Sequence, residues 1–209
     1  MVAQPRMCAG DRRLRRLREY LNMFKRTADQ IRIHEEHFIP MCLPHIYKED
    51  FEPNRLRLFK EFGLTSLKVG ALELLPRRYG KTTCVGQFSA AMMMIGCRFT
   101  IATFAPGGRA SSSLMTLTVQ LLYQLPGGKE RVIAKNEEQF LVATADQVHE
   151  NGTLKFSKST IKDSGNVNRL LAFPASSNGT VSFFPIVSLS RARAHTHAHM
   201  HTRPRQAGR

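Results

Sequence analysis

Residues 67–95 decide the fold of this chain, and they read LKVGALELLPRRYGKTTCVGQFSAAMMMI. The apolar run Leu67–Leu75 suits a buried strand, and a short basic loop, Pro76–Thr83, follows it. From Cys84 to Ile95 the apolar residues recur at helical spacing. A strand that leads through a Gly-Lys-Thr turn into a helix is the architecture of a phosphate-binding loop, because the first-turn N–H groups and the helix dipole converge on one spot.

The loop supplies the residue types that bind a nucleoside triphosphate. Lys81 is expected to reach the terminal phosphates, and Thr82 to hold a magnesium ion through its hydroxyl. The position five residues before Gly80 is Leu75, where the standard pattern has glycine, so Gly-Lys-Thr is not specific by itself. The loop predicts ATP and Mg²⁺ as cofactors. The predicted nucleotide-binding residues are Pro76, Arg77, Arg78, Tyr79, Gly80, Lys81, Thr82 and Thr83.

The chain beyond the loop continues the α/β pattern. Gly96 stands where the helix is expected to stop, and Phe99–Ala105 is predicted to be the next buried strand, which completes a βαβ unit. A further helix is predicted at Ala110–Leu125. Short strands are predicted at Arg131–Lys135, Phe140–Thr144, Thr153–Ser157 and Leu170–Phe173. We expect an α/β fold: a partial P-loop NTPase (ASCE-like) with a parallel sheet flanked by helices, preceded by a helical N-terminal segment.

Two stretches of the sequence resemble a known family. Pro76–Thr82 is similar to the deviant phosphate loop of the large terminase subunit, the viral DNA-packaging ATPase, and above all to its herpesvirus-type branch. Phe173–Gly179 resembles a run that lies shortly before the acidic Walker B strand in those proteins. The resemblance covers roughly residues 55–180. It implies that a loop arginine, Arg77 or Arg78, acts catalytically as a cis arginine finger on the γ-phosphate.

By this resemblance the chain is a fragment of a motor that powers the packaging of viral double-stranded DNA into capsids. The implied partners are double-stranded DNA, other terminase subunits and the capsid portal, and the complete protein is expected to form a homo-oligomer. The implied location is the host nucleus for a herpesvirus-type protein. We find no counterpart of the family's Walker B strand or nuclease domain, so hydrolysis is expected to be impaired.

Other residues are additional candidates for the nucleotide site. An apolar run ends at Asp146, which makes it a candidate Walker B aspartate, although Gln147 follows where the catalytic glutamate is usual. Arg109 follows a Pro-Gly-Gly turn at the end of a predicted strand, where it is either a nucleotide or DNA contact or a surface arginine. Related ATPases often place an adenine-reading glutamine before the loop, but no glutamine lies between Gln30 and Gln87.

The formal net charge of +15 over 209 residues is the strongest global feature. Such an excess of basic residues favours a polyanionic partner through counterion release, and nucleic acid fits best. The alternative function is therefore a basic nucleic-acid-binding protein without ATPase activity. A small P-loop ATPase unrelated to packaging would need an Asp-Glu pair after an apolar run, which we do not find. Because no apolar run approaches ~20 residues and the four cysteines form no Cys-x-x-Cys pair, we expect a soluble intracellular protein with no membrane contact.

The sequence predicts that the chain consists of three segments. Residues 1–60 are expected to form a basic helical N-terminal segment, residues 61–180 an incomplete P-loop ATPase domain, and residues 181–209 a disordered Arg/His-rich tail. The tail alternates histidine with small residues, which suggests read-through from a truncated or mis-spliced gene. In the first segment an amphipathic basic helix is predicted around Leu14–Phe24. We favour a solvated packing helix there over a DNA-contacting arm.

The rest of that first segment adds a second helix, predicted at Pro53–Leu64. Between the two helices stand residues that can bind metals, but their spacing matches no standard zinc pattern. They are His34, His37, Cys42 and His45.

Overall fold

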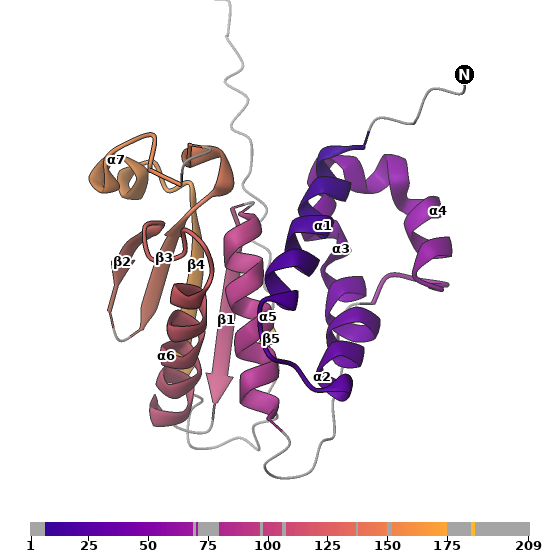
Figure 1. Cartoon of the computed structure of the whole chain (residues 1–209), viewed down its shortest axis with the longest axis horizontal. Coiled ribbons are helices and arrows are strands. Elements are labelled where there is room, and N and C mark those ends of the chain that lie inside the picture. The colour runs from indigo at the N-terminus through magenta and orange to yellow at the C-terminus, as the bar shows by residue number, and fades with distance from the viewer. Residues whose placement is uncertain are drawn as a thin grey trace, which may run out of the picture.

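The computed structural model describes residues 7–68, 70, 80–96, 98–105, 108–136, 138–149, 152–174 and 185–186. Figure 1 shows a group of N-terminal helices beside a sheet with its own helices. The N-terminal helices are α1 (Ala9–Asn22), α2 (Ala28–Ile33), the π-helical η1 (His34–Phe38), α3 (Ile39–Tyr47), the short 3₁₀ turn η2 (Lys48–Asp50) and α4 (Phe51–Glu61). The later elements are α5 (Lys81–Ile95), β1 (Thr100–Ala105), α6 (Gly108–Gln124), β2 (Val132–Lys135), β3 (Gln139–Ala143), the 3₁₀ turn η3 (Ala145–Gln147), α7 (Lys158–Asp163), β4 (Val167–Pro174) and β5 (Pro185–Ile186).

The predicted α/β fold is confirmed. The prediction of a parallel sheet is wrong, because the sheet is mixed. Its strand order is β2-β3-β4-β1-β5, and the two-residue β5 only extends one edge. β1 and β4 run parallel, whereas β3 is antiparallel to both of its neighbours and β5 is antiparallel to β1. For the pair β2 and β3 the reason is their short connection, where the Asn136 N–H donates to the Gln139 carbonyl at 2.9 Å. A parallel pair would need a crossover of a dozen or more residues.

Most predicted helices and strands are confirmed in type, although their ends shift: α1 begins five residues before Leu14, and β4 begins three residues before Leu170. The predicted strand at Thr153–Ser157 is wrong: Leu154 makes a single bridge with Val148, and Ser157 instead caps α7 by accepting from the Thr160 N–H at 3.2 Å. The strand predicted at Leu67–Leu75 lies almost wholly outside the described residues, and the described ones are in no strand.

α5 is buried along most of its length because it is apolar on nearly every side. Figure 1 shows α5 between the N-terminal helices and the sheet with α6. Its residues share one hydrophobic core with α1, with α3 and α4, and with β1, β3 and β4. The described parts of residues 1–60 and 61–180 are therefore joined by a common core. No helix in the described ranges has both the length and the apolar composition to cross a bilayer.

The C-terminal end of α5 is anchored by two buried polar side chains. Arg131 Nη1 donates to the Met94 carbonyl at 2.7 Å, and Asn168 Nδ2 donates to the Met93 carbonyl at 3.1 Å. Asn168 Oδ1 also accepts from the Phe99 N–H at 3.3 Å, at the start of β1. These bonds satisfy carbonyls that a helix end leaves unpaired. They also connect α5 directly to the first residues of β1 and β4.

The anchor predicts a stability effect for Asn168→Ala. Asn168 is fully buried, and the substitution leaves a carbonyl and an N–H without their partner. We expect the free energy of unfolding to fall by about 2–3 kcal/mol, measured by urea denaturation. Asn166→Ala, two residues earlier on a half-exposed position, is the matched control and should change stability little. Equal stability of the two variants would mean that the anchor contributes nothing.

Candidate functional site

Of the predicted phosphate-binding turn, the structure describes the last residues, from Gly80 to Thr83, at the start of α5. Gly80 is the residue before the helix and has a left-handed φ of 75°, which glycine adopts without strain. Lys81 is the first helical residue, and the Lys81 and Thr82 side chains are exposed while Thr83 is half-buried. Gly80 brings no side chain to cap the helix, and the first turn contains no acidic residue. This helix end therefore carries positive potential from its dipole and from Lys81.

The sheet topology sets this turn at the carboxyl edge of the parallel strands. A short connection joins the end of α5 to the start of β1, so α5 and β1 run in opposite directions and the start of α5 lies toward the end of β1. β4 is parallel to β1 in register from Thr100 opposite Arg169 to Ala105 opposite Pro174. The described residues of the two stretches that carry the resemblance, 80–82 and 173–174, thus lie toward the same edge. In open α/β sheets this is the edge at which ligands bind.

Gln30 of α2 holds the turn before α5 through a side-chain hydrogen bond, a role that the sequence did not predict. Its side chain is buried, Nε2 donates to the Gly80 carbonyl at 3.4 Å, and Oε1 accepts from the Thr27 N–H at 3.0 Å. A Cβ added to Gly80 would lie 2.8 Å from Gln30 Nε2, so the end of the Gln30 side chain would have to move and its bond to the Gly80 carbonyl would be disturbed. The one sequence signal was the capping pair Thr27 and Gln30, which predicts a helix start and not a contact 50 residues away.

His34 lies under the first turn of α5 in a buried hydrogen-bond network. His34 Nε2 is 2.9 Å from the Cys84 carbonyl, which can only accept, so this nitrogen carries the proton. Nδ1 is then the acceptor for Arg26 Nη1 at 3.1 Å. Cys84 Sγ also lies 3.2 Å from His34 Nε2. The pKa of His34 is lowered to about 4, because burial disfavours the charged ring and Arg26 repels it, against the opposing effect of the Cys84 carbonyl.

A second glutamine joins the same interface between α5 and the N-terminal helices. Gln87 Nε2 donates to the Lys25 carbonyl at 3.4 Å, one turn of α5 beyond Cys84. Gln30 and Gln87, which bound the stretch without glutamines in the sequence, therefore both hold α5 against the N-terminal segment. In the described part of the chain, both glutamines bond to backbone carbonyls. These bonds fix the direction in which the start of α5 points.

Pro76, Arg77, Arg78 and Tyr79 lie outside the described residues, and so does the side chain of Arg109.

The structure contradicts the candidate Walker B role of Asp146. This residue follows β3, which is antiparallel to β4, so it lies at the opposite edge of the sheet from the start of α5. It lines a groove together with Ile95 and Gly96, at the far end of α5. α5 has 15 residues, which at about 1.5 Å each separates the two ends by about 22 Å. An acid at that distance cannot share a magnesium ion with Thr82.

Metal binding by histidine and cysteine has no support in the described part of the chain. There, no three His, Cys, Asp or Glu side chains gather closely enough to hold a metal ion. His34 contacts Cys84 and Arg26 instead, as described above.

The buried His34 predicts a loss of stability on acidification. Its pKa of about 4 in the folded protein lies below the ordinary value of 6.5, so the unfolded chain binds the proton more readily. Stability is therefore highest above about pH 6.5 and falls as the pH drops toward 4. Between about pH 7.5 and pH 4.5, His34 should account for about 2 kcal/mol of the loss. Thermal or urea unfolding at several pH values measures it.

The matched variants for this measurement are His34→Gln and His149→Gln. Glutamine keeps a donor near the position of Nε2 but does not titrate, so His34→Gln should flatten the pH dependence. A residual slope is expected from His45, whose pKa burial and Lys48 also lower to about 4. His149 is exposed, and its variant should keep the wild-type slope. Unchanged slopes in both variants would contradict the role assigned to His34.

Comparisons of the chain with protein-family models, with curated proteins and with solved structures found no match. The interpretation of the site therefore depends on the residues at the start of α5 and on their position in the fold.

Proposed function

We propose that this chain binds a magnesium nucleoside triphosphate at the start of α5, as the ATP-binding part of a terminase-like DNA-packaging ATPase. The observation that carries the proposal is the position of Lys81: it is the first, exposed residue of a long helix whose start lies at the carboxyl edge of β1 and β4. Backbone N–H groups, the helix dipole and an ammonium group together favour a phosphate at that point.

The residues of the first turn suit the two proposed cofactors. Lys81 Nζ would neutralise the terminal phosphates of ATP, and the exposed Thr82 hydroxyl is a suitable oxygen ligand for Mg²⁺. The absence of acidic residues from the first turn of α5 avoids repulsion of a polyanion. Arg77 or Arg78 would act as the cis arginine finger by the resemblance to terminases. Gln30 and His34 position the turn and touch no substrate in this proposal.

Hydrolysis is proposed to be weak because the described parallel strands do not end in an acid. β1 ends in Thr103-Phe104-Ala105 and β4 in Ala172-Phe173-Pro174. At the end of these strands the Phe104 and Phe173 rings stack with centroids 5.3 Å apart. A Walker B strand would supply an aspartate and a neighbouring glutamate there to complete the magnesium shell and orient the attacking water. Binding without efficient turnover is the expected behaviour.

The alternative function is a basic nucleic-acid-binding protein without ATPase activity. The net charge of +15 favours it. Both functions allow DNA binding, so affinity for DNA does not separate them. Magnesium-dependent binding of an ATP analogue does, because only the first function requires a built triphosphate site.

Lys81→Ala should abolish most of that binding. Removing a charged donor to phosphate is expected to weaken the affinity for a non-hydrolysable Mg·ATP analogue by about 10- to 100-fold. Lys60→Ala is the matched control, because Lys60 is equally exposed but lies on α4. Fluorescence titration of the full chain with a labelled analogue measures both.

Two outcomes would contradict the proposal in different ways. Equal loss in Lys81→Ala and Lys60→Ala, or binding that is indifferent to magnesium, would mean that the turn is no triphosphate site. Rapid turnover that disappears in Lys81→Ala would instead mean that a catalytic acid reaches the site from elsewhere in the chain.

A further inference from the structure

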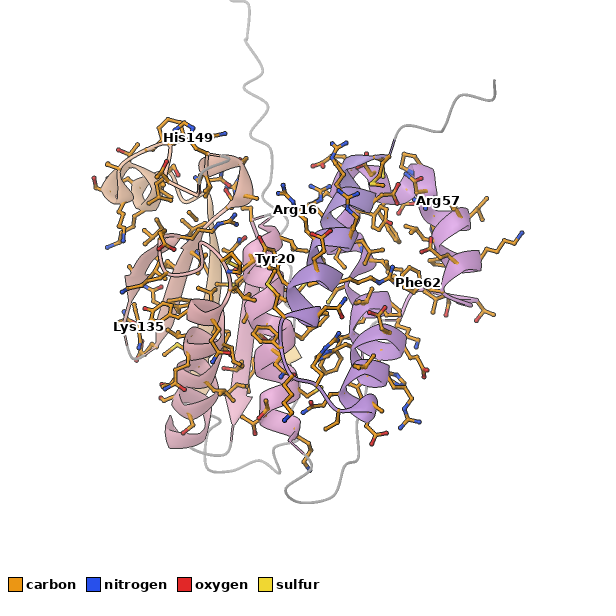
Figure 2. The ribbon with its side chains drawn as sticks, viewed as in Figure 1. Arg16, Tyr20, Arg57, Phe62, Lys135 and His149 are labelled. Atoms are coloured by element: carbon orange, nitrogen blue, oxygen red, sulfur yellow. The ribbon has the colours of Figure 1, made fainter. Side chains whose placement is uncertain are left out.

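A groove rich in arginine lies at the end of α5 that is remote from Lys81. It runs between α1 and the residues that connect α5 to β1 and β3 to α7, and its volume is about 620 Å³. Figure 2 shows Arg16 on α1 in the gap beside the end of α5. Six basic side chains and two carboxylates line the groove. The basic ones are Arg12, Arg13, Arg15, Arg16, Lys48 and Arg98, and the acidic ones are Glu49 and Asp146.

Among the described residues, most of these basic side chains have no carboxylate partner. Arg13 lies 3.9 Å from Asp50, and Arg15 forms an exposed pair with Glu19 at 3.5 Å. The other four basic side chains make no ion pair with a carboxylate among the described residues. Where they are bonded, the acceptors are backbone carbonyls, as for Arg12 with Met7 at 2.9 Å and Lys48 with Arg98 at 3.3 Å. Such bonds hold the side chains in place and leave their charge available to an external anion.

The helix dipole of α5 would oppose an anion here, since the groove touches its negative end. Arg131 offsets this effect. Its guanidinium is buried against the end of α5 and donates to the Met94 carbonyl at 2.7 Å. Asn168 Nδ2 donates to the Met93 carbonyl at 3.1 Å. Two of the carbonyl oxygens at this helix end are thus already paired, and one of those two is paired with a positive charge.

We propose that this groove binds the phosphodiester backbone of double-stranded DNA without sequence preference. Arginine guanidinium groups match phosphate oxygens in charge and geometry. No aromatic side chain is among the described residues that line the groove, and proteins that hold single strands stack the bases on such side chains. Contacts to phosphates alone are the pattern of non-specific duplex binding. Apart from Ile95, the apolar side chains that line the groove are alanines, Ala9 and Ala145, so it has no large apolar side chain to insert into a lipid surface.

The choice of a DNA duplex as the polyanion rests on the proposed packaging function, but the site itself does not depend on nucleotide binding. The two sites lie at opposite ends of α5, about 22 Å apart by its 15 residues at about 1.5 Å each. One can therefore be removed while the other is retained. The groove also accounts for the basic face of α1, for which we favoured simple solvation on sequence grounds.

The test compares two triple variants of the full chain. Arg12→Gln, Arg16→Gln and Arg98→Gln together remove groove charges. Lys60→Gln, Lys155→Gln and Lys162→Gln together remove the same charge from exposed positions elsewhere. Both retain residues 181–209, so the basic tail contributes equally. The probe is a short fluorescent duplex of random sequence, titrated by anisotropy between about 50 and 200 mM salt.

We expect the groove variant to bind the duplex at least about tenfold more weakly, with the slope of log K against log salt reduced by about 2–3, and the control to stay near wild type. Equal losses in the two variants would overturn the proposal, because only net charge would then matter. So would a preference for single-stranded over duplex DNA, or groove-dependent binding to phosphatidylserine vesicles that exceeds binding to the duplex.

Two readouts keep the outcome interpretable. The groove variant should have the wild-type circular dichroism spectrum and the wild-type affinity for the Mg·ATP analogue, which shows that it is folded. Lys81→Ala should bind the duplex as the wild type does. If the nucleotide fails to bind but the groove variant still loses DNA affinity, the proposed function fails and the groove assignment stands.

Discussion

The structure depends on the burial of α5, a helix that is apolar on nearly every side. Such a helix is stable only when other elements cover it all round. Here α1 and the π-helical η1 contact it from the N-terminal half and α6 from the α/β half. A helix end also leaves its last carbonyls without intrahelical partners, and Arg131 and Asn168 satisfy two of them, those of Met94 and Met93. Burial and anchoring together fix the direction of the helix, and so decide where both of its ends point.

The N-terminal helices consequently do more than precede the α/β part. Gln30 reaches the carbonyl of Gly80, and His34 reaches that of Cys84, so the first turn of α5 is bonded to residues 50 positions earlier. His34 can accept from Arg26 only while it is neutral, because its other nitrogen already donates to Cys84. Hydrogen bonds from Gln30 and His34 therefore hold the turn that we propose binds a triphosphate. The bonds of His34 require its imidazole to be uncharged.

Charge is distributed along α5 in a way that serves both proposals. At one end the positive pole of the helix dipole and Lys81 stand together, with no acid in the first turn. At the other end the negative pole is paired with Arg131, and arginines from α1 surround it. A single buried helix thus separates two electropositive regions that lie too far apart to compete for one ligand. Nucleotide and duplex could occupy them at the same time.

The sequence by itself determined the elements whose signals are local. The apolar spacing from Cys84 to Ile95, the apolar stretch Phe99–Ala105 and the glycine after the helix predicted α5 and β1 correctly, because each reflects a preference within a few residues. Only the tertiary structure decided three features: the mixed sheet, the position of Asp146 at the sheet edge opposite the start of α5, and the contacts of Gln30 and Arg131. The short β2–β3 connection sets the direction of that pair alone. The β3–β4 pairing and the contacts between residues remote in sequence depend on how longer connections fold back in space, and no local pattern of residues encodes that.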